Sequence, residues 1–175
     1  VIAAALIALL TAGGIGMSAL VRYFLSEGKF VAGYDRTPSK LTDSLIEEGA
    51  QLHFEENEEL IPAECKEPAS TLVIFTPAIP AGHKEWKLFR EGGFTIKKRA
   101  EVLGIITRNK KGVCAAGTHG KTTTSTMTAH LLHQSSVDCA AFLGGISKNY
   151  KSNLILSEKS DLVVIEADEY DRSFL

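Results

Sequence analysis

Hydrophobic residues in this chain gather into short apolar runs that are separated by glycine, proline or polar turns. Between the runs lie segments with helical spacing, such as Leu41, Leu45 and Ile46 after a potential capping residue, Ser39. Strands are predicted at 2–10, 29–35, 51–54, 70–80, 94–97, 111–117, 138–145 and 161–169. Helices are predicted at 17–28, 37–50, 83–93, 98–109 and from the loop after residue 117 to about His133. This alternation is typical of an α/β fold with parallel sheets and helices on both faces.

The most plausible domain boundary is the basic polar stretch TRNKKG at residues 107–112, which separates two strand–helix–strand blocks. Residues 1–108 are expected to form one complete small domain, and residues 109–175 part of a second. Because the second block has few residues for an α/β nucleotide-binding domain, we expect it to be truncated.

The first 21 residues contain no charged side chain, and about 20 apolar residues are enough for a membrane-spanning helix. A glycine-rich turn at Gly13, Gly14, Ile15 and Gly16 interrupts this run. A buried parallel strand, a turn and a helix also give a continuous apolar run. We therefore favour a strand–turn–helix unit and keep a membrane anchor as the alternative.

Composition places the chain among ordinary globular proteins. Of its 175 residues 45% are hydrophobic and 23% charged, and the formal net charge is −2. This balance gives no electrostatic reason to expect nucleic acid or a membrane surface as a partner. Cys114 and Cys139 lie in apolar runs and are expected to be buried free thiols, which fits a reducing cytoplasm.

The stretch AAGTHGKTTTSTM at 115–127 lies between a predicted strand and a predicted helix. It departs from the phosphate-loop pattern G-x-x-x-x-G-K-[ST] only at Ala115, which stands where the pattern has glycine. Two glycines allow the backbone N–H groups to point inward at a helix start, Lys121 can reach phosphates, and the Thr122 hydroxyl can bind Mg²⁺. The expected ATP contacts are Gly117, Thr118, His119, Gly120, Lys121, Thr122 and Thr123.

An acidic cluster follows the last apolar run, with Glu166, Asp168, Glu169 and Asp171 close together. A carboxylate at the carboxyl end of a parallel strand faces the crevice in which α/β sheets bind ligands, and can hold Mg²⁺ there. The alternative is a solvated acidic turn.

The glycines near the N-terminus match a dinucleotide-binding fingerprint only in part. Gly13 and Gly16 fit two positions of G-x-G-x-x-G, but Thr11 stands at the first. Asp35 ends the second predicted strand, where such a fold places its ribose-binding acid. These features leave an NAD-binding module open.

Several motifs together resemble the Mur ligases. They are GGIGMSAL at 13–20, GYDRTPS at 33–39, TPAIP at 76–80, GTHGKTTT at 117–124 and EADEYDRSFL at 166–175. In that family, alanine in place of the first glycine of the phosphate loop is common. The resemblance implies a Rossmann-like parallel-sheet domain that binds a UDP-sugar at residues 1–108, followed at 109–175 by the first part of a P-loop ATPase domain.

The resemblance also implies a reaction. ATP phosphorylates the carboxylate of UDP-N-acetylmuramate, and the amine of L-alanine displaces phosphate from the acyl phosphate, a step of peptidoglycan synthesis. It implies catalytic roles for Lys121 and Glu166 and magnesium ligation by Thr122 and Glu166. The implied UDP-sugar contacts are Gly13, Gly14, Ile15, Gly16, Asp35 and Arg36. His83 and Lys84 are further candidates beside the sugar, with a solvated helix start as the alternative.

Three alternatives stay open. A sister ligase of the same family attaches a peptide to the same sugar nucleotide for cell-wall recycling. An NAD-binding oxidoreductase or regulatory Rossmann module would use the first glycines and leave the loop at 117 unexplained. A membrane-anchored nucleotide switch would use residues 1–21. Under the ligase hypothesis the chain is a fragment that is not expected to be active alone.

Overall fold

The computed structural model describes residues 4 and 6–167, so the expected acids Asp168, Glu169 and Asp171 lie outside the described residues. The chain divides into two compact units, Val1–Val102 and Leu103–Leu175, which we call unit 1 and unit 2. This division falls within helix α4 (Arg99–Thr107), whereas the boundary predicted from the sequence follows that helix.

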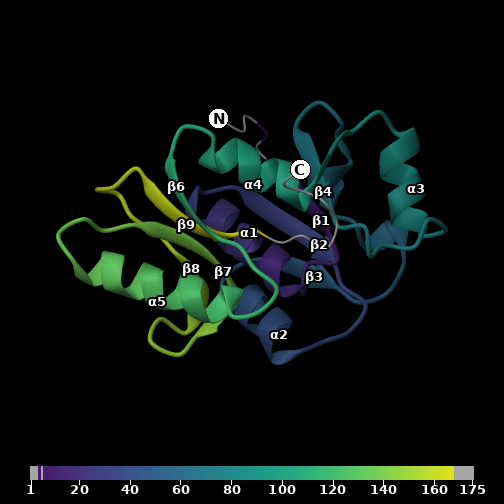
Figure 1. Cartoon of the computed structure of the whole chain (residues 1–175). Coiled ribbons are helices and arrows are strands. Elements are labelled where there is room, and N and C mark those ends of the chain that lie inside the picture. Colours follow the sequence, from purple (N-terminus) through teal and green to yellow (C-terminus); the bar gives the residue numbers. More distant parts are fainter. Residues whose placement is uncertain (1–3, 5, 168–175) are drawn as a thin grey trace. The chain divides into compact units, whose positions relative to one another are not determined.

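Unit 1 is built on a five-stranded parallel sheet with the strand order β3-β2-β1-β4-β5 (Figure 1). The strands are β1 (Leu6–Leu10), β2 (Phe30–Tyr34), β3 (Gln51–His53), β4 (Thr71–Phe75) and β5 (Thr95–Lys98). The connecting helices are α1 (Ile15–Ser26), α2 (Lys40–Glu47), the short 3-10 helices η1 (Glu58–Leu60) and η2 (Ala63–Lys66), and α3 (Lys84–Glu91). Strand order reverses between β1 and β4, and such a switch point is where open α/β sheets bind ligands.

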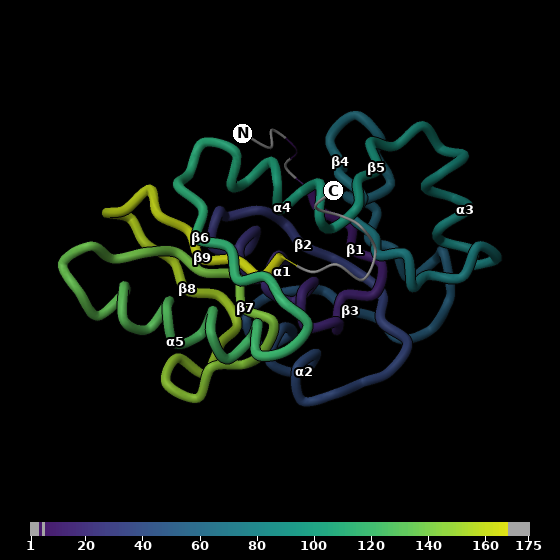
Figure 2. Tube along the Cα trace, in the orientation of Figure 1, coloured from purple at the N-terminus to yellow at the C-terminus, as the bar shows by residue number. Residues whose placement is uncertain are grey.

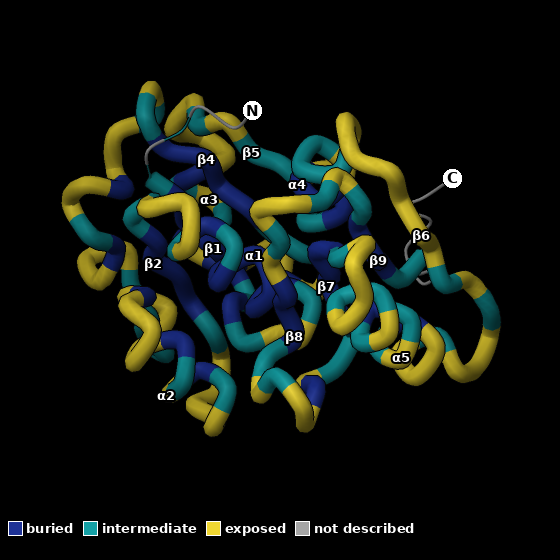
Figure 3. The backbone as a smooth tube through the Cα atoms, turned by 90° about the vertical axis from the view of Figure 1, so that its left-hand side faces the viewer, coloured by how far each residue is buried: buried dark blue, intermediate teal, exposed yellow. Residues whose placement is uncertain are grey.

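Both faces of the unit 1 sheet are covered, which explains why its central strands are continuous apolar runs. Ala8 and Leu10 of β1 belong to a buried cluster with Cys65 of η2 and Phe89 of α3. Helix α1 packs on β1 and β2. Figure 3 shows these central strands as buried backbone beneath exposed loops.

Local signals in unit 1 behave as the sequence predicted. Ser39 caps α2, because its hydroxyl accepts from the Thr42 N–H while the Thr42 hydroxyl accepts from the Ser39 N–H. Gly28 and Gly49 follow the ends of α1 and α2 with φ values of 69° and 111°, a conformation in which helices commonly end. The α/β fold class is confirmed.

Unit 2 contains a four-stranded sheet with the order β6-β9-β7-β8 and one long helix, α5 (Lys121–Gln134), that packs on β6, β7 and β9. The strands are β6 (Lys111–Ala115), β7 (Ala140–Ser147), β8 (Ser152–Ile155) and β9 (Leu162–Glu166). The tube in Figure 2 follows the chain from β6 through the loop into α5.

Strand β8 was not predicted, and it runs antiparallel to β7, so the sheet of unit 2 is not wholly parallel. Its four residues, Ser152 to Ile155, are too few to show a periodic pattern. It pairs with β7 through Ala141 with Ile155, Phe142 with Leu154 and Ser147 with Ser152.

The expectation that both Cys114 and Cys139 are buried is half wrong. Cys139 is buried beside Ala129 of α5, but Cys114 is exposed. Cys114 lies on β6, which is an edge strand with β9 as its partner within the described residues. An apolar run does not reveal whether its strand will be central or at an edge.

The membrane-anchor alternative for residues 1–21 does not fit the fold. Residues 6–10 pair with both β2 and β4 as the central strand of a sheet, and the glycine turn separates them from α1. Within residues 4 and 6–167, no helix combines the length and the apolar character needed to cross a membrane.

A group of titratable side chains is buried where β2, β3 and the start of α3 meet. His83 is 3% exposed, and its ring lies 4.5 Å from that of Tyr34, so the helix start is not solvated at His83, while its contact with the sugar stays a prediction. Glu85 is 1% exposed, with its Oε2 3.5 Å from His53 Nε2. Within the described part of the chain, both His83 ring nitrogens and Glu85 Oε1 have no hydrogen-bond partner. Burial raises the pKa of Glu85 to about 7 and lowers the pKa of His53.

Replacing Glu85 by glutamine is expected to change how stability depends on pH. The carboxyl titrates near 4.5 in the unfolded chain and near 7 in the folded one, so the folded protein holds more protons between these values. Wild-type stability therefore falls as pH rises through this interval, while the Glu85→Gln variant has no such loss. Relative to wild type, the variant is expected to gain at most about 3 kcal/mol between pH 4.5 and 8.

Urea unfolding followed by fluorescence of Trp86, the chain's one tryptophan, measures this difference at each pH. Glu91→Gln is the matched control, because Glu91 lies at the exposed end of the same helix. If the Glu85 variant and wild type keep a constant difference from pH 4.5 to 8, Glu85 does not titrate as described.

Candidate functional site

The predicted phosphate loop is an exposed turn that leads from β6 into α5. Gly117 has φ 139° and Gly120 has φ 78°, both in the region that glycine adopts without strain. Gly120 is the N-cap of α5, and the Thr124 N–H donates to its carbonyl at 2.8 Å. Both positions thus have backbone conformations that explain why the loop contains glycine there.

Helix α5 begins without a side-chain cap and without an acidic residue in its first turn. The first N–H groups of a helix have no partner within it, and the helix dipole makes this end positive. Thr118, His119, Thr122 and Thr123 are exposed around this end. The arrangement favours an anion such as a phosphate group.

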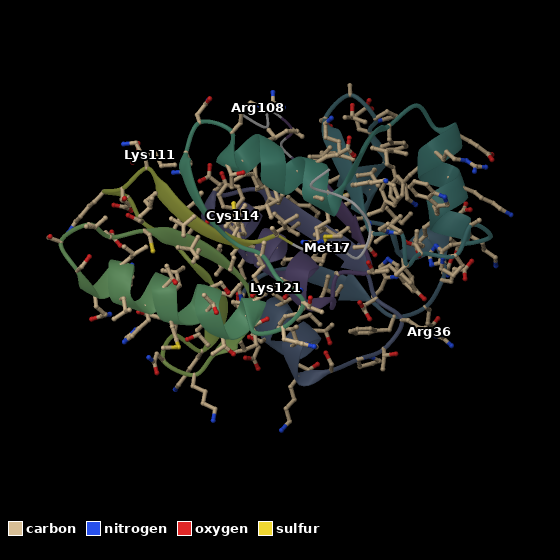
Figure 4. All side chains as sticks on the ribbon, viewed as in Figure 1. Met17, Arg36, Arg108, Lys111, Cys114 and Lys121 are labelled. Carbon is tan, nitrogen blue, oxygen red and sulfur yellow. The ribbon has the colours of Figure 1, made fainter. Side chains whose placement is uncertain are left out.

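Lys121 is the first residue of α5, and Figure 4 labels it where the loop enters the helix. Its Nζ donates to the Gly117 carbonyl at 2.8 Å, so the ammonium group lies across the loop. No carboxylate pairs with it among residues 4 and 6–167. The ammonium is therefore available to an anion bound by the loop.

Glu166 lies at the carboxyl end of β9, directly opposite Ala115 of β6 in the parallel register. The Thr122 hydroxyl donates to Glu166 Oε2 at 3.1 Å. Glu166 Oε1 accepts from the Ser125 hydroxyl at 2.9 Å and from the Gly144 N–H at 2.8 Å. Strand pairing thus brings together Thr122 and Glu166, which are 44 residues apart in the sequence.

These residues fit a nucleotide with its magnesium ion. Hydroxyl and carboxylate oxygens are the ligands that Mg²⁺ prefers, and the ion usually takes one or two protein ligands together with phosphate oxygens. Thr122 and Glu166 supply one oxygen each, beside a helix start that favours phosphate.

The glycine turn of unit 1 is tied to the end of β2 through Asp35. The Gly13 N–H donates to Asp35 Oδ2 at 2.7 Å, and the Thr37 N–H donates to Oδ1 at 3.1 Å. A Cβ at position 13 would lie 2.7 Å from Thr42 Cγ2 and 2.9 Å from Asp35 Oδ2, so only glycine fits. The carboxylate of Asp35 therefore holds the turn in place.

Helix α1 starts at Ile15 with Gly14 as its N-cap, again without a side-chain cap or an acidic first turn. Gly14 and Ile15 are exposed, and Gly16 is partly exposed. Arg36 is exposed at the turn that follows β2, where Figure 4 labels it. Like α5, α1 has the positive end of its helix dipole at an accessible turn, which favours an anion.

Thr11 occupies the position at which the dinucleotide fingerprint has its first glycine. Its φ of 69° lies in the left-handed region that a β-branched residue rarely adopts. Its hydroxyl lies 2.9 Å from that of Thr76, which follows β4, so the two sides of the switch point are joined here.

Sequence reasoning missed Ser125 and Gly144, which complete the surroundings of Glu166. Ser125 lies one helical turn after Thr122, and this spacing places both hydroxyls on one face of α5. The pair Gly144 and Gly145 inside β7 is also visible in the sequence. Neither signal indicates Glu166 as the partner, because the contacts span 41 and 22 residues.

Fold and site together define a class: α/β proteins in which a phosphate-loop-like turn lies next to an acidic residue on the adjacent strand. Comparison with known proteins narrows this class. The family model described as Mur ligase family, catalytic domain matches residues 6–111. The chain belongs to the Mur ligase family.

Curated relatives match most of the chain. The UDP-N-acetylmuramate–L-alanine ligase of Phocaeicola vulgatus is 69% identical over 163 residues, and that of Porphyromonas gingivalis is 60% identical over 162 residues. Both matches cover 93% of this chain and 36% of the relative. The chain thus spans about a third of the length of these relatives.

Solved structures share the fold. The UDP-N-acetylmuramate-alanine ligase of Thermotoga maritima superposes with a TM-score of 0.81 at 29% identity, covering 91% of this chain and 36% of that one. A UDP-N-acetylmuramate:L-alanyl-gamma-D-glutamyl-meso-diaminopimelate ligase from Neisseria has a TM-score of 0.84 at 23% identity, covering 97% of this chain and 54% of that one. The second likeness shows the fold alone.

Proposed function

We propose that this chain is the sugar-nucleotide-binding domain and the first part of the ATP-binding domain of a ligase that joins L-alanine to UDP-N-acetylmuramate in peptidoglycan synthesis. The observation that carries the proposal is the bond between Thr122 and Glu166 beside the exposed loop that holds Lys121. The names of relatives at 60–69% identity support the choice of substrates. Free cysteines agree with a cytoplasmic location, which stays a prediction.

A carboxylate is a poor electrophile, so the reaction needs a leaving group. The γ-phosphoryl group of ATP passes to the muramate carboxylate, and ADP leaves. The alanine amine then attacks the acyl carbon, phosphate departs with one former carboxylate oxygen, and the amine loses a proton. Magnesium supplies charge neutralisation between the phosphates when it is bound.

The site residues of unit 2 have separate roles in this reaction. The N–H groups at the start of α5 hold phosphate oxygens, and Lys121 neutralises charge on the transferring group. Thr122 and Glu166 hold the ion. His119 is exposed in the loop and serves as a polar contact for the nucleotide.

The residues of unit 1 bind the sugar nucleotide. The N–H groups at the start of α1 donate to the oxygens of the diphosphate, Asp35 fixes the glycine turn, and Arg36 adds a positive charge beside it. Each Asp35 oxygen accepts one backbone N–H, so this carboxylate shapes the turn, and titration with both ligands separates the sugar nucleotide from NAD.

The sister ligase for cell-wall recycling differs in the amine that it accepts. The relatives named for alanine reach 69% identity over 93% of this chain, which favours alanine as the amine. In a full-length ligase that carries these 175 residues, product formed with L-alanine supports the proposal. Product formed only with a peptide that begins with alanine would assign the sister reaction.

Calorimetric titration of the chain tests the role of unit 1. UDP-N-acetylmuramate is expected to bind and NAD is not. Asp35→Ala removes the acceptor of the Gly13 and Thr37 N–H groups, and is expected to weaken sugar-nucleotide binding by about tenfold because the turn loses its charge-assisted hydrogen bond at Gly13.

Asp43→Ala is the matched control, because Asp43 is an exposed acid on the neighbouring helix α2. It is expected to leave the affinity unchanged. Binding of NAD without binding of the sugar nucleotide would contradict the proposal.

A further inference from the structure

The two oxygens of Glu166 have different surroundings. Oε1 accepts two hydrogen bonds, from the Ser125 hydroxyl at 2.9 Å and the Gly144 N–H at 2.8 Å. Oε2 accepts from the Thr122 hydroxyl at 3.1 Å. Each carboxylate oxygen has about two lone-pair directions, so the scaffold saturates Oε1 and leaves capacity on Oε2.

Ser125 is completely buried on the face of α5 that packs against the sheet. Its hydroxyl also lies 3.1 Å from the Thr122 carbonyl, but its single proton can serve only one acceptor at a time. The ionised carboxylate is the stronger acceptor and lies closer, so the proton points to Glu166.

Gly144 touches the carboxylate so closely that no side chain fits. A Cβ at this position would lie 2.4 Å from Glu166 Oε2, 2.7 Å from Oε1 and 2.8 Å from the carboxyl carbon. Its φ is not positive, so glycine is needed here for space and not for backbone conformation. Any larger residue must displace the carboxylate from its present position.

We infer that Ser125 and Gly144 are positioning residues. They hold Oε1 of Glu166 so that Oε2, beside the Thr122 hydroxyl, is the single oxygen presented to the divalent cation of a bound nucleotide. This inference rests on the proposed function. It adds a buried layer behind the metal ligands, and the loss of such partners typically costs 10–100-fold in metal affinity.

The test uses a full-length ligase that carries these residues, with Mn²⁺ and ATP as the probes. Electron paramagnetic resonance measures the Mn²⁺ dissociation constant in the presence of ATP, and calorimetry in EDTA measures ATP binding without metal. Ser125→Ala is expected to raise the Mn²⁺ constant about tenfold, and Gly144→Ala up to about 100-fold. ATP binding in EDTA should stay unchanged. A variant that had lost its folded structure would lose this binding as well.

Ser125→Thr keeps the hydroxyl and is expected to retain Mn²⁺ binding close to wild type. Gly112→Ala is the glycine control, because its Cβ would meet its nearest neighbour, Cys114 Sγ, at an ordinary 3.7 Å. If Gly144→Ala does not fold, the comparison of Ser125→Ala with Ser125→Thr tests the inference.

Equal Mn²⁺ constants for wild type, Ser125→Ala and Ser125→Thr would overturn the inference while leaving the ligase proposal intact. If the wild-type protein bound neither ATP with Mn²⁺ nor UDP-N-acetylmuramate, that result would contradict the proposed function.

Discussion

Lys121→Ala is expected to lower phosphoryl transfer by about 10³-fold or more in a full-length ligase that carries this chain. The Lys121 Nζ lies 2.8 Å from the Gly117 carbonyl oxygen across the loop, and residues 115–124 contain no other lysine and no arginine. Its removal leaves the developing charge on the transferring phosphoryl group without its nearest cation. Binding of UDP-N-acetylmuramate should persist, because the glycine turn belongs to unit 1.

Phosphate release in the presence of L-alanine measures the loss, and calorimetry with the sugar nucleotide measures what remains. Lys159→Ala is the matched control, since Lys159 is exposed in the same unit. A variant at position 121 that keeps a tenth of the wild-type rate would show that Lys121 does not act on the transferring group.

Gly33→Ala is expected to destabilise unit 1 by about 2–4 kcal/mol. Gly33 lies in β2 and pairs with Leu9 of β1. An added Cβ would lie 2.6 Å from the Leu9 carbonyl oxygen and 3.1 Å from the Leu9 Cβ. The clash is with the backbone of the central strand, which cannot move without disturbing the hydrogen bonds on both of its sides.

Urea unfolding followed by Trp86 fluorescence measures this effect, because Trp86 packs against Phe75 of β4 in the same unit. Gly82→Ala is the control: Gly82 is exposed, and its added Cβ would meet nothing within 4 Å. The control should stay within about 0.5 kcal/mol of wild type. Equal stability of Gly33→Ala and wild type would mean that β1 and β2 do not approach as closely as described.

Sequence and structure agree best where the signal is local. Ser39 was recognised as a cap because a hydroxyl at that position competes well for helix N–H groups, whatever surrounds it. The loop around Lys121 was recognised because its glycines, lysine and threonines all lie within eight consecutive residues. Asp35 was recognised as an important acid, but its attachment to Gly13 was not, since that bond spans 22 residues.

The sequence by itself determined the alternation of strands and helices, the two glycine turns and the chemistry of the loop, because these depend on neighbours a few residues apart. Tertiary structure decided which strands lie at an edge, and so exposed Cys114 and formed β8. It also decided that Ser125 and Gly144 close around Glu166. Such contacts arise only when β6, β7 and β9 pair side by side, and no local pattern records which distant residue a strand will bring near.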